Sequence, residues 1–240
     1  MVPSKLWNFL GATRRNWISR NDHKLSTREV FSKIYEKRLW SGDERYSSGD
    51  GSRTDSVVNP YVEAISKWAR ANEATNLHAV DLGCGDFHIG RRIYSEFGRY
   101  TGVDIVPALI ENHRQTYLDQ RLQFSCLDAI EEELPSGDVI LVRQVLQHLS
   151  NAQISAILPK IAKFKFAIIT EHHPAPEDLH VKNYDKPHGG GIRLAAGSGV
   201  YLDSPPFSLP FVSQDILLDV ASNPKKPSAG RIVTTVYTFQ

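Results

Sequence analysis

The stretch that decides the fold reads Ala79-Val-Asp-Leu-Gly83-Cys-Gly85-Asp-Phe-His-Ile-Gly90. Its apolar start predicts a buried strand, and the glycines that follow predict a tight turn that opens a helix. Such a turn lets a ligand approach the backbone closely and presents amide donors at a helix N-terminus. The stretch therefore predicts a ligand-binding turn, although a single Gly-x-Gly pattern does not identify the ligand.

Two residues around this turn distinguish between possible ligands. A dinucleotide fold needs a glycine three residues after Gly85, where the pyrophosphate lies on the helix, and this sequence has His88 there. Asp81 stands two residues before the first glycine, where a carboxylate repels a phosphate and attracts a cation such as the ammonium of a methionine group. The turn is therefore predicted to prefer a cationic ligand to NAD.

Carboxylates also follow the next two predicted strands. Asp104 comes at the end of the run Tyr100–Ile105, where it can accept both hydrogen bonds of a ribose diol, a feature that NAD sites share. Asp128 follows the run Leu122–Leu127 and is placed to accept from an adenine amino group, which NAD sites do not share. Any one acid alone is also explained as a cap or turn residue. Together the acids match the crevice at the carboxyl ends of strands in open sheets.

Strands and helices alternate along most of the chain. This rhythm predicts an α/β fold, namely a Rossmann-like seven-stranded sheet, mostly parallel with an antiparallel C-terminal pair, and helices on both faces. Helices are expected at 26–40, from Asn59-Pro60 to 71, at 89–97, at 107–117 and after the capping box Ser150-x-x-Gln153. Besides the three strands above, strands are expected at 139–143, 166–170, 215–221 and 231–239.

The length and composition of the chain fit one such domain with an N-terminal extension. The chain has 240 residues, of which 41% are hydrophobic and 23% charged, as is usual for a globular protein. No apolar run approaches the roughly 20 residues that a membrane helix needs, and no signal-peptide pattern is present. The two cysteines, Cys84 and Cys126, form no Cys-x-x-Cys pair, so we expect reduced thiols and a cytoplasmic location.

Charge is unevenly distributed. Residues 1–40 hold nine Lys and Arg against three Asp and Glu, and such an arm can touch nucleic acid, an anionic membrane surface or an acidic substrate. A solvated extension is the more usual meaning of such a run. Further along, residues 174–210 carry six prolines and five glycines, a composition that fits either a moving lid or a rigid surface loop.

The motifs just described resemble those of class I S-adenosylmethionine (SAM)-dependent methyltransferases. The resemblance covers roughly residues 29–172 and is closest to a bacterial group with an Asp-x-Gly-Cys-Gly-Asp motif followed by an aromatic residue, and with a Val-Leu-Gln-His-Leu motif after the fourth strand. Its N-terminal signature is matched by Ile34-Tyr35, Trp40 and the Ser48–Ser52 loop. The matching motifs are Asp81-Leu-Gly-Cys-Gly-Asp, Gly102-Val-Asp104, Asp128 and Val145-Leu-Gln-His148-Leu.

The resemblance implies SAM as cofactor. It places the methionine part at Asp81 and the glycines, the ribose at Asp104 and the adenine at Asp128. The implied cofactor-binding set is Asp81, Gly83, Cys84, Gly85, Asp104, Ile105, Asp128, Ala129 and Arg143. It also implies two parts, with a basic arm, helix and cofactor-covering loop at 1–55 and the methyltransferase domain at 56–240, which carries the lid-like insertion at 174–210. Departures from the family pattern are Phe87, where many members have a third glycine, and Arg143-Gln144, where relatives often carry an acid.

Methyl transfer to a hydroxyl group needs a general base, and neutral imidazole suits that role. The candidate catalytic residues are His148, after the fourth strand, and His172 and His173, after the fifth. Each is equally compatible with a packing or capping role. The nearby run from Glu171 to His180 is rich in possible ligands but has no standard metal spacing and is broken by prolines, so no metal is expected.

These inferences predict transfer of a methyl group from SAM to a small-molecule acceptor, or to a glycan or lipid biosynthetic intermediate, at oxygen. Transfer to nitrogen, or to RNA or protein, is the alternative among enzymes. Nucleic acid is the less favoured partner because the Asn/Asp-Pro-Pro-Tyr box of many amino-group methylases is missing. A SAM-binding module without catalysis is the alternative from another class.

Overall fold

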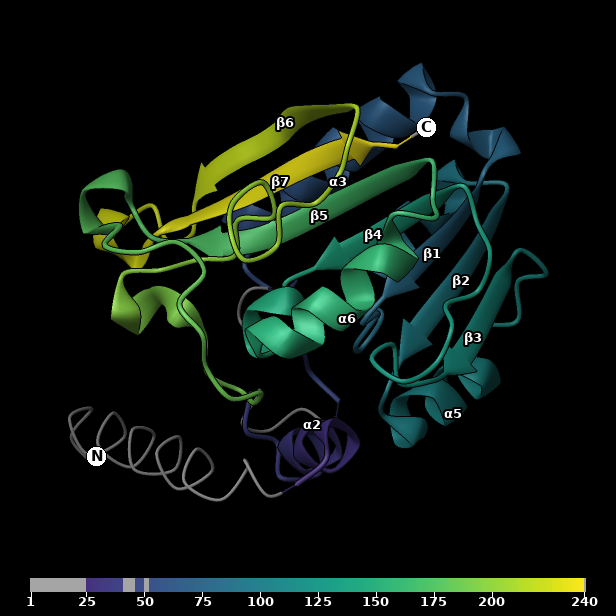
Figure 1. Cartoon of the computed structure of the whole chain (residues 1–240). Coiled ribbons are helices and arrows are strands. Elements are labelled where there is room, and N and C mark those ends of the chain that lie inside the picture. Colours follow the sequence, from purple (N-terminus) through teal and green to yellow (C-terminus); the bar gives the residue numbers. More distant parts are fainter. Residues whose placement is uncertain (1–24, 41–45, 50–51, 240) are drawn as a thin grey trace.

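The computed structural model describes residues 25–40, 46–49 and 52–239 (Figure 1). Residues 1–24 of the predicted basic N-terminal part and residues 41–45 and 50–51 of the predicted covering loop lie outside the described residues. The strands are β1 (His78–Leu82), β2 (Arg99–Asp104), β3 (Leu122–Cys126), β4 (Val139–Arg143), β5 (Phe166–His173), β6 (Ser213–Ala221) and β7 (Arg231–Thr238). The α-helices are α2 (Thr27–Glu36), α3 (Asp55–Ala71), α4 (Gly90–Ile93), α5 (Pro107–Thr116) and α6 (Asn151–Ile161).

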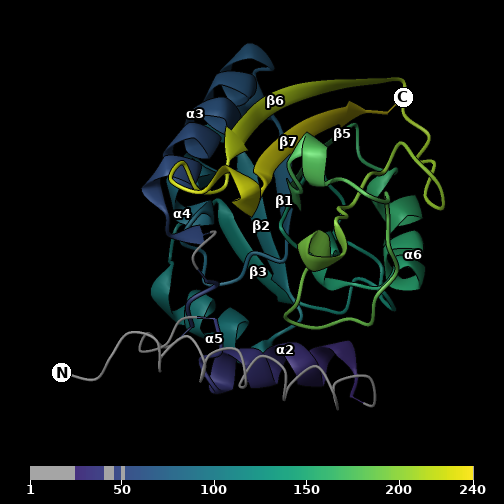
Figure 2. The same cartoon turned by 90° about the vertical axis from the view of Figure 1, so that its left-hand side faces the viewer.

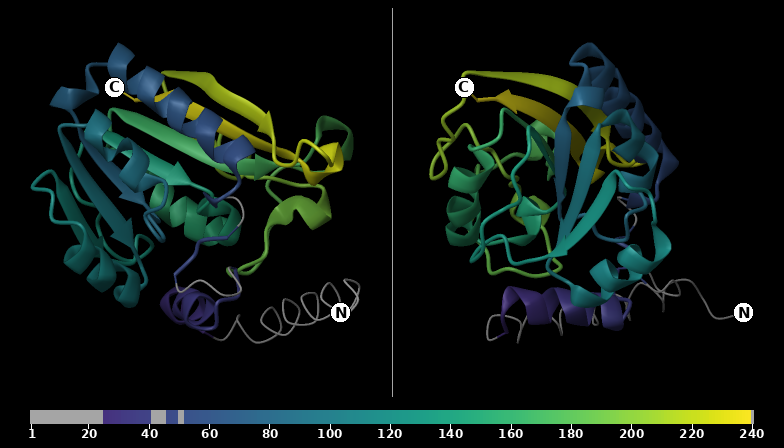
Figure 3. Two further views of the ribbon diagram at one scale, coloured as in Figure 1. Left: turned by 180° about the vertical axis from the view of Figure 1, so that it is seen from behind. Right: turned by 90° about the vertical axis from the view of Figure 1, so that its right-hand side faces the viewer.

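These strands form one seven-stranded sheet in the order β3-β2-β1-β4-β5-β7-β6. β1 to β5 pair in parallel, and β7 lies antiparallel between β5 and β6. α3, α4 and α5 lie on one side of the sheet and α6 on the other (Figure 2; Figure 3). The predicted Rossmann-like sheet with an antiparallel C-terminal pair is therefore confirmed.

Two apolar clusters fill the space between the sheet and its helices. Tyr61, Ile65 and Trp68 of α3 pack against one face of the sheet. Ile154 and Ile157 of α6 pack against the other face. The parallel strands between them are almost fully buried, so their sequences are continuous apolar runs instead of alternating ones.

α2 lies across the end of the sheet toward which the arrowheads of β1 to β4 point (Figure 1; Figure 2). Its N-terminus has a capping box, because the Ser26 side chain accepts from the backbone of Glu29 and the Glu29 side chain accepts from the backbone of Ser26. The helix ends at Glu36, earlier than predicted, and residues 37–40 form a turn that brings Trp40 back toward the helix.

The start of α3 differs from the prediction. Asn59-Pro60 does not open the helix, which begins at Asp55 and includes Pro60. The Asn59 side chain instead accepts a 2.9 Å hydrogen bond from Arg92 Nη2. Proline removes one helical hydrogen bond here, but the extra first turn buries Val57 and Val58 completely, so tertiary packing outweighs the local signal.

Two further boundaries were predicted wrongly. The expected helix at 89–97 is α4 followed by a separate 3₁₀ turn at Tyr94–Glu96. β5 continues through His172 and His173, which were expected after the strand, because β7 pairs with it as far as His173 opposite Arg231. The two histidines therefore lie in a strand, and their side chains point to opposite faces of the sheet.

Residues 174–210 contain only short 3₁₀ turns but pack firmly against the domain. Val200, Leu202 and Leu209 are buried in the same apolar cluster as α6. Inside the segment, the buried Asn183 side chain donates to the carbonyl of Tyr201 at 2.8 Å and accepts from its N–H at 2.7 Å. The segment is therefore held by side-chain hydrogen bonds and burial instead of regular secondary structure.

Within the described ranges, no helix combines the length and apolar character that crossing a membrane requires.

Candidate cofactor and acceptor site

A cavity of about 410 Å³ lies at the carboxyl ends of β1 to β4. The topology places it where open α/β sheets bind ligands, beside the point at which the strand order reverses. The cavity lining includes every residue of the predicted cofactor set, namely Asp81, Gly83, Cys84, Gly85, Asp104, Ile105, Asp128, Ala129 and Arg143.

Asp104 connects the end of β2 to the glycine turn. Its Oδ2 accepts from the N–H of Gly85 at 2.9 Å and its Oδ1 accepts from the N–H of Val106 at 3.0 Å. The carboxylate is buried, and these bonds fix its orientation in the cavity wall. Each oxygen of a carboxylate can accept more than one hydrogen bond, so this arrangement can still receive the two hydroxyls of a ribose.

The two glycines bring the backbone to the cavity wall and leave room for neighbouring side chains. Gly83 has φ +73° and Gly85 has φ +53°, both in the left-handed region. A Cβ at Gly83 would collide with the side chain of Val145, and one at Gly85 would collide with Ser48. The backbone therefore forms part of the cavity wall directly, which is the close approach that the sequence predicts.

Asp81 and Arg143 place opposite charges on neighbouring strands. Asp81 Oδ2 accepts a 2.9 Å hydrogen bond from Tyr100, and the Arg143 guanidinium lies 4.9 Å from the centre of the Tyr61 ring. Burial raises the pKa of Asp81 to about 7, although the hydrogen bond from Tyr100 opposes this shift. An ammonium and a carboxylate, the two ends of an amino-acid group, fit this pair.

The raised pKa of Asp81 predicts that binding of SAM depends on pH. Below pH about 7 the carboxyl group is protonated, and it must lose that proton to pair with an ammonium. We expect the affinity to fall about tenfold for each pH unit below 7 and to level off above it. Isothermal titration between pH 5.5 and 8 in two buffers of different ionisation enthalpy measures the affinity and the released proton. Asp81→Asn should bind weakly at every pH, and a pH-independent wild-type affinity would contradict the prediction.

The turn after β3 carries the residues predicted to contact adenine. Asp128 Oδ1 accepts from the N–H of Ile130 at 2.9 Å, and its own N–H donates to Glu132 at 2.8 Å. Lys160 of α6 donates to the carbonyls of Ala129 and Ile130 at 2.8 and 2.9 Å. The loop that carries the predicted adenine contacts is therefore anchored at several points.

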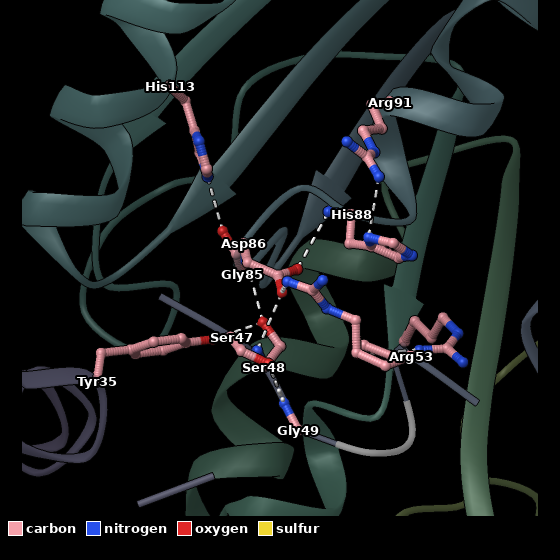
Figure 4. A network of polar contacts seen from close by, with 12 residues as sticks. Tyr35, Ser47, Ser48, Gly49, Arg53, Gly85, Asp86, His88, Arg91 and His113 are labelled. Carbon is pink, nitrogen blue, oxygen red and sulfur yellow. Dashed lines mark hydrogen bonds and ion pairs between the residues drawn. The ribbon is translucent and has the colours of Figure 1, made fainter. Parts of the chain in front are cut away.

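A second loop, residues 46–49, contacts the glycine turn through reciprocal hydrogen bonds (Figure 4). The N–H of Ser48 donates to Asp86 Oδ2 at 3.1 Å, and the N–H of Asp86 donates to Ser48 Oγ at 3.0 Å. Tyr35 of α2 shares a 2.9 Å hydrogen bond with Ser48 Oγ, and Arg53 forms an ion pair with Asp86 at 3.0 Å. Tyr35 and Ser48 also line the cavity.

The residues of this network were not predicted as site residues. The resemblance to the Ser-Gly-x-Gly-Ser signature was the available signal, but the partner Asp86 is 38 residues away in the chain. A further unpredicted contact comes from His113 of α5, whose Nε2 donates to the carbonyl of Gly85 at 2.7 Å (Figure 4). This bond assigns the proton of the neutral ring to Nε2.

His148 lies in the cavity wall beside aromatic rings. Its ring centre is 5.2 Å from that of Trp40 and 6.3 Å from that of Phe31. Nδ1 lies 3.2 Å from the carbonyl of Gly189, and Nε2 lies 3.3 Å from the side-chain nitrogen of Gln147. A carbonyl only accepts, so Nδ1 carries the proton and Nε2 carries the lone pair. Burial lowers the pKa of His148 to about 4, so the ring is neutral near pH 7.

The other two candidate histidines lie in different places. His172 lines the cavity and its Nε2 donates to the carbonyl of Ala229 at 2.7 Å. His173 does not line the cavity; its Nε2 donates to the carbonyl of Val200 at 2.9 Å and its ring stacks on Tyr201 at 4.4 Å. The structure therefore brings His148 and His172 to the cavity and leaves His173 outside it. Among the described residues, no three His, Cys, Asp or Glu side chains gather as a metal site.

Comparison with known proteins finds a family match in the central part of the chain. Residues 80–164 match the family model described as a methyltransferase domain. A malonyl-[acyl-carrier protein] O-methyltransferase of Acetivibrio thermocellus is 32% identical over 62 residues. That match covers 25% of this chain and 22% of the relative, so only about a fifth of the relative's length is compared.

Solved structures resemble the whole fold at low sequence identity. The N-methyltransferase NodS of Bradyrhizobium japonicum, solved with S-adenosyl-L-homocysteine (SAH), has a TM-score of 0.57 and 12% identity, covering 88% of this chain and 100% of that one. DhpI, solved with SAH, has a TM-score of 0.55 and 12% identity over 89% and 95%. Magnesium protoporphyrin IX methyltransferase of Synechocystis, solved with SAM, has a TM-score of 0.54 and 15% identity over 88% and 97%.

The family match covers the glycine turn, the strand ends with Asp104 and Asp128, and the His148 turn, all of which line one cavity. The lining of the cavity fits SAM, with the carboxylates of Asp81 and Asp104 as acceptors for its ammonium and ribose and with the glycine backbone in the cavity wall. Residues 80–164 thus match a methyltransferase-domain model, the fold is shared with solved methyltransferases, and the lining of the cavity fits S-adenosyl-L-methionine as cofactor.

Proposed function

We propose that this chain catalyses transfer of a methyl group from SAM to an oxygen atom of a small molecule, or of a glycan or lipid biosynthetic intermediate. The observation that carries the proposal is that the complete predicted cofactor set and the neutral His148 line the same cavity. Asp128 and Ala129 would hold the adenine, Asp104 the ribose, and Asp81 with Arg143 the amino-acid end. The glycine turn, including Cys84, and Ile105 would complete the cofactor site.

Oxygen is the proposed acceptor atom because of the charge on the described residues beside the cofactor set. Gln147, His148 and His172 line the cavity there together with the aromatic side chains of Phe31 and Trp40. None of these side chains carries a net charge near pH 7, because burial lowers the pKa values of both histidines. A neutral hydroxyl compound with an apolar body fits such a wall, since no buried charge is left unpaired.

In the proposed reaction, bound SAM supplies an electrophilic methyl group on its sulfonium sulfur. The acceptor oxygen would form a bond to the methyl carbon as the bond from carbon to sulfur breaks, which would give the methyl ether and SAH. The hydroxyl proton would pass to Nε2 of His148, whose lone pair receives the side-chain amide of Gln147 in this structure and would exchange that contact for the acceptor. The cavity walls hold the acceptor in line and exclude water, which supplies much of the rate in such displacements.

The proposed organisation assigns residues 56–240 to the methyltransferase domain and residues 1–55 to an arm, a helix and a loop that cover the cofactor. Tyr35 and Ser48, which line the cavity from the N-terminal part, support this division. The segment at 174–210 is proposed to cover the acceptor side. The contact between its Gly189 and His148 supports that role.

A titration followed by a turnover assay tests the proposal. SAM and SAH should each raise the melting temperature of the full chain. Methyl-labelled SAM is then incubated with acceptor panels of phenols and alcohols, amines, carboxylic acids, glycan and lipid intermediates, and RNA. Labelled product with the hydroxyl panel supports the proposal, whereas product with amines or RNA alone would replace oxygen by the alternative acceptor. Binding of both ligands without turnover in any panel would instead indicate a module without catalysis.

A further inference from the structure

The turn that carries His148 is flanked by two buried charges. Leu146–His148 form a single 3₁₀ turn directly after β4. Glu171 of β5 is 3% exposed, and Arg193 of the segment at 174–210 is 2% exposed. Neither residue is in the cavity lining, so neither is explained by contact with cofactor or acceptor.

Glu171 binds the amide end of the turn. Its Oε1 accepts from the N–H of Leu146 at 3.1 Å, and its Oε2 accepts from the N–H of Gln147 at 2.9 Å. Amides at the start of a helical turn have no partner within the turn, and they carry partial positive charge. The two carboxyl oxygens therefore satisfy these amides, and the ionised form complements their charge. Burial raises the pKa of Glu171 to about 8, while the hydrogen bonds from this turn and the charge of Arg193 oppose that shift.

Arg193 binds the carbonyl end of the same turn. Its Nη1 donates to the carbonyls of Gln147 and Leu146 at 3.1 and 3.4 Å, and its Nη2 donates to the carbonyl of Leu149 at 2.7 Å. The remaining donors reach Tyr184 and Asn151, so the guanidinium is fully used. A planar fork of donors meets several carbonyls at once, which a lysine ammonium does less well.

The two charges do not touch each other. They form no ion pair within 4.0 Å among the described residues, although each influences the pKa of the other. Burying a charge is costly unless hydrogen bonds satisfy it, and here the backbone of one turn supplies those bonds for both residues. Apolar residues would fill the same space without hydrogen bonds, whereas Glu171 accepts from the amide end of the turn and Arg193 donates to its carbonyl end.

The same segment also reaches the imidazole ring. Gly189 accepts from Nδ1 of His148, and Lys186 donates to the His148 carbonyl at 3.3 Å. Arg193 therefore anchors both the turn and the segment whose carbonyl selects the tautomer of the ring. The ring also faces the backbone of Gly191, the side chain of Gln147 and the rings of Phe31 and Trp40, and the charges of Lys186 and Arg193 act on it.

We propose that Glu171 and Arg193 are positioning residues that hold the His148 turn and, through Gly189, keep the His148 lone pair on Nε2. The inference rests on the proposed function, in which that lone pair accepts the proton. It makes the segment at 174–210 a structural requirement for the base.

The test measures the imidazole directly and needs no acceptor. Full-length chain labelled with ¹⁵N and ¹³C at histidine is titrated by NMR, with the His148 signal assigned from His148→Gln. The variants are Arg193→Met, which keeps the length of the side chain without its donors, and Glu171→Gln, which keeps its shape. Lys182→Met is the matched control, because it removes an exposed charge from the same segment, where Lys182 contacts Ser204.

In the wild type and in Lys182→Met, we expect His148 to have the Nδ1–H tautomer and a pKa near 4. In both test variants we expect a mixture of tautomers and a pKa displaced toward the value of about 6.5 of a solvated histidine. Affinity for SAM should stay within about threefold in all variants. With an identified acceptor, kcat should fall at least about tenfold while the KM for SAM is unchanged.

Unchanged tautomer and titration in both test variants would overturn the inference. So would a wild-type ring protonated at Nε2, a measurement that stands even if a variant fails to fold. Absence of SAM binding by the wild type would refute the proposed function instead. The NMR experiment would still show whether Glu171 and Arg193 fix the tautomer of His148, because it needs no ligand.

Discussion

Asp104→Ala is expected to weaken the binding of SAM by at least about 100-fold, enough to remove its effect on the melting temperature. Hydrogen bonds to a charged group contribute about 1.5–3 kcal/mol each, and the proposed ribose contact has two. The variant also loses the acceptors for the N–H groups of Gly85 and Val106, so the glycine turn keeps only its backbone hydrogen bonds from Gly83 and Cys84 to Val103 of β2. Both effects act on the same cavity.

Differential scanning fluorimetry and isothermal titration measure this loss. Asp119→Ala is the matched control, since Asp119 pairs with Arg121 on the surface and does not line the cavity. It should respond to SAM as the wild type does. Circular dichroism of each protein without ligand separates lost binding from lost folding. A folded Asp104→Ala protein with an unchanged affinity would refute the proposed ribose site.

The second large effect is expected at His148. With an acceptor from the turnover assay, His148→Gln should lower kcat by about 10²- to 10⁴-fold, because a general base contributes a factor of that size. Affinity for SAM should change little, since His148 lies beside the aromatic wall of Phe31 and Trp40, apart from the three acids. A large fall in kcat with an unchanged affinity for SAM would show that His148 acts in the chemical step and not in cofactor binding.

His78→Gln is a suitable control for this variant. His78 begins β1, at the opposite end of the strand from the cavity, and contacts Thr101 at 2.8 Å. His172→Gln and His173→Gln are measured in parallel as the competing candidates. A larger loss of kcat in either of them than in His148→Gln would move the proposed base to that histidine.

Much of the cofactor site was predictable because its signals are local. Buried parallel strands are continuous apolar runs, and the acids directly follow or end those runs. Once the strands are placed side by side, Asp81, Asp104 and Asp128 must meet at one edge of the sheet. The short range of this pattern explains why the predicted cofactor residues all line the observed cavity.

Contacts between distant segments could not be predicted in the same way. Ser48 pairs with Asp86, and Arg193 reaches Leu149, 44 residues earlier in the chain. The pattern of apolar and polar residues does not predict such a contact, because the contact depends on how two distant segments pack in space. The predicted start of α3 is wrong for a related reason. Burial of Val57 outweighs the preference of proline for the first turn of a helix.

The reciprocal hydrogen bonds between Ser48 and Asp86 have a thermodynamic consequence. They join the N-terminal helix and its loop to the turn that receives the cofactor. Linkage is reciprocal, so the factor by which SAM strengthens docking of this helix equals the factor by which the docked helix strengthens retention of SAM. A change that weakens docking of the N-terminal helix is then expected to weaken retention of SAM as well.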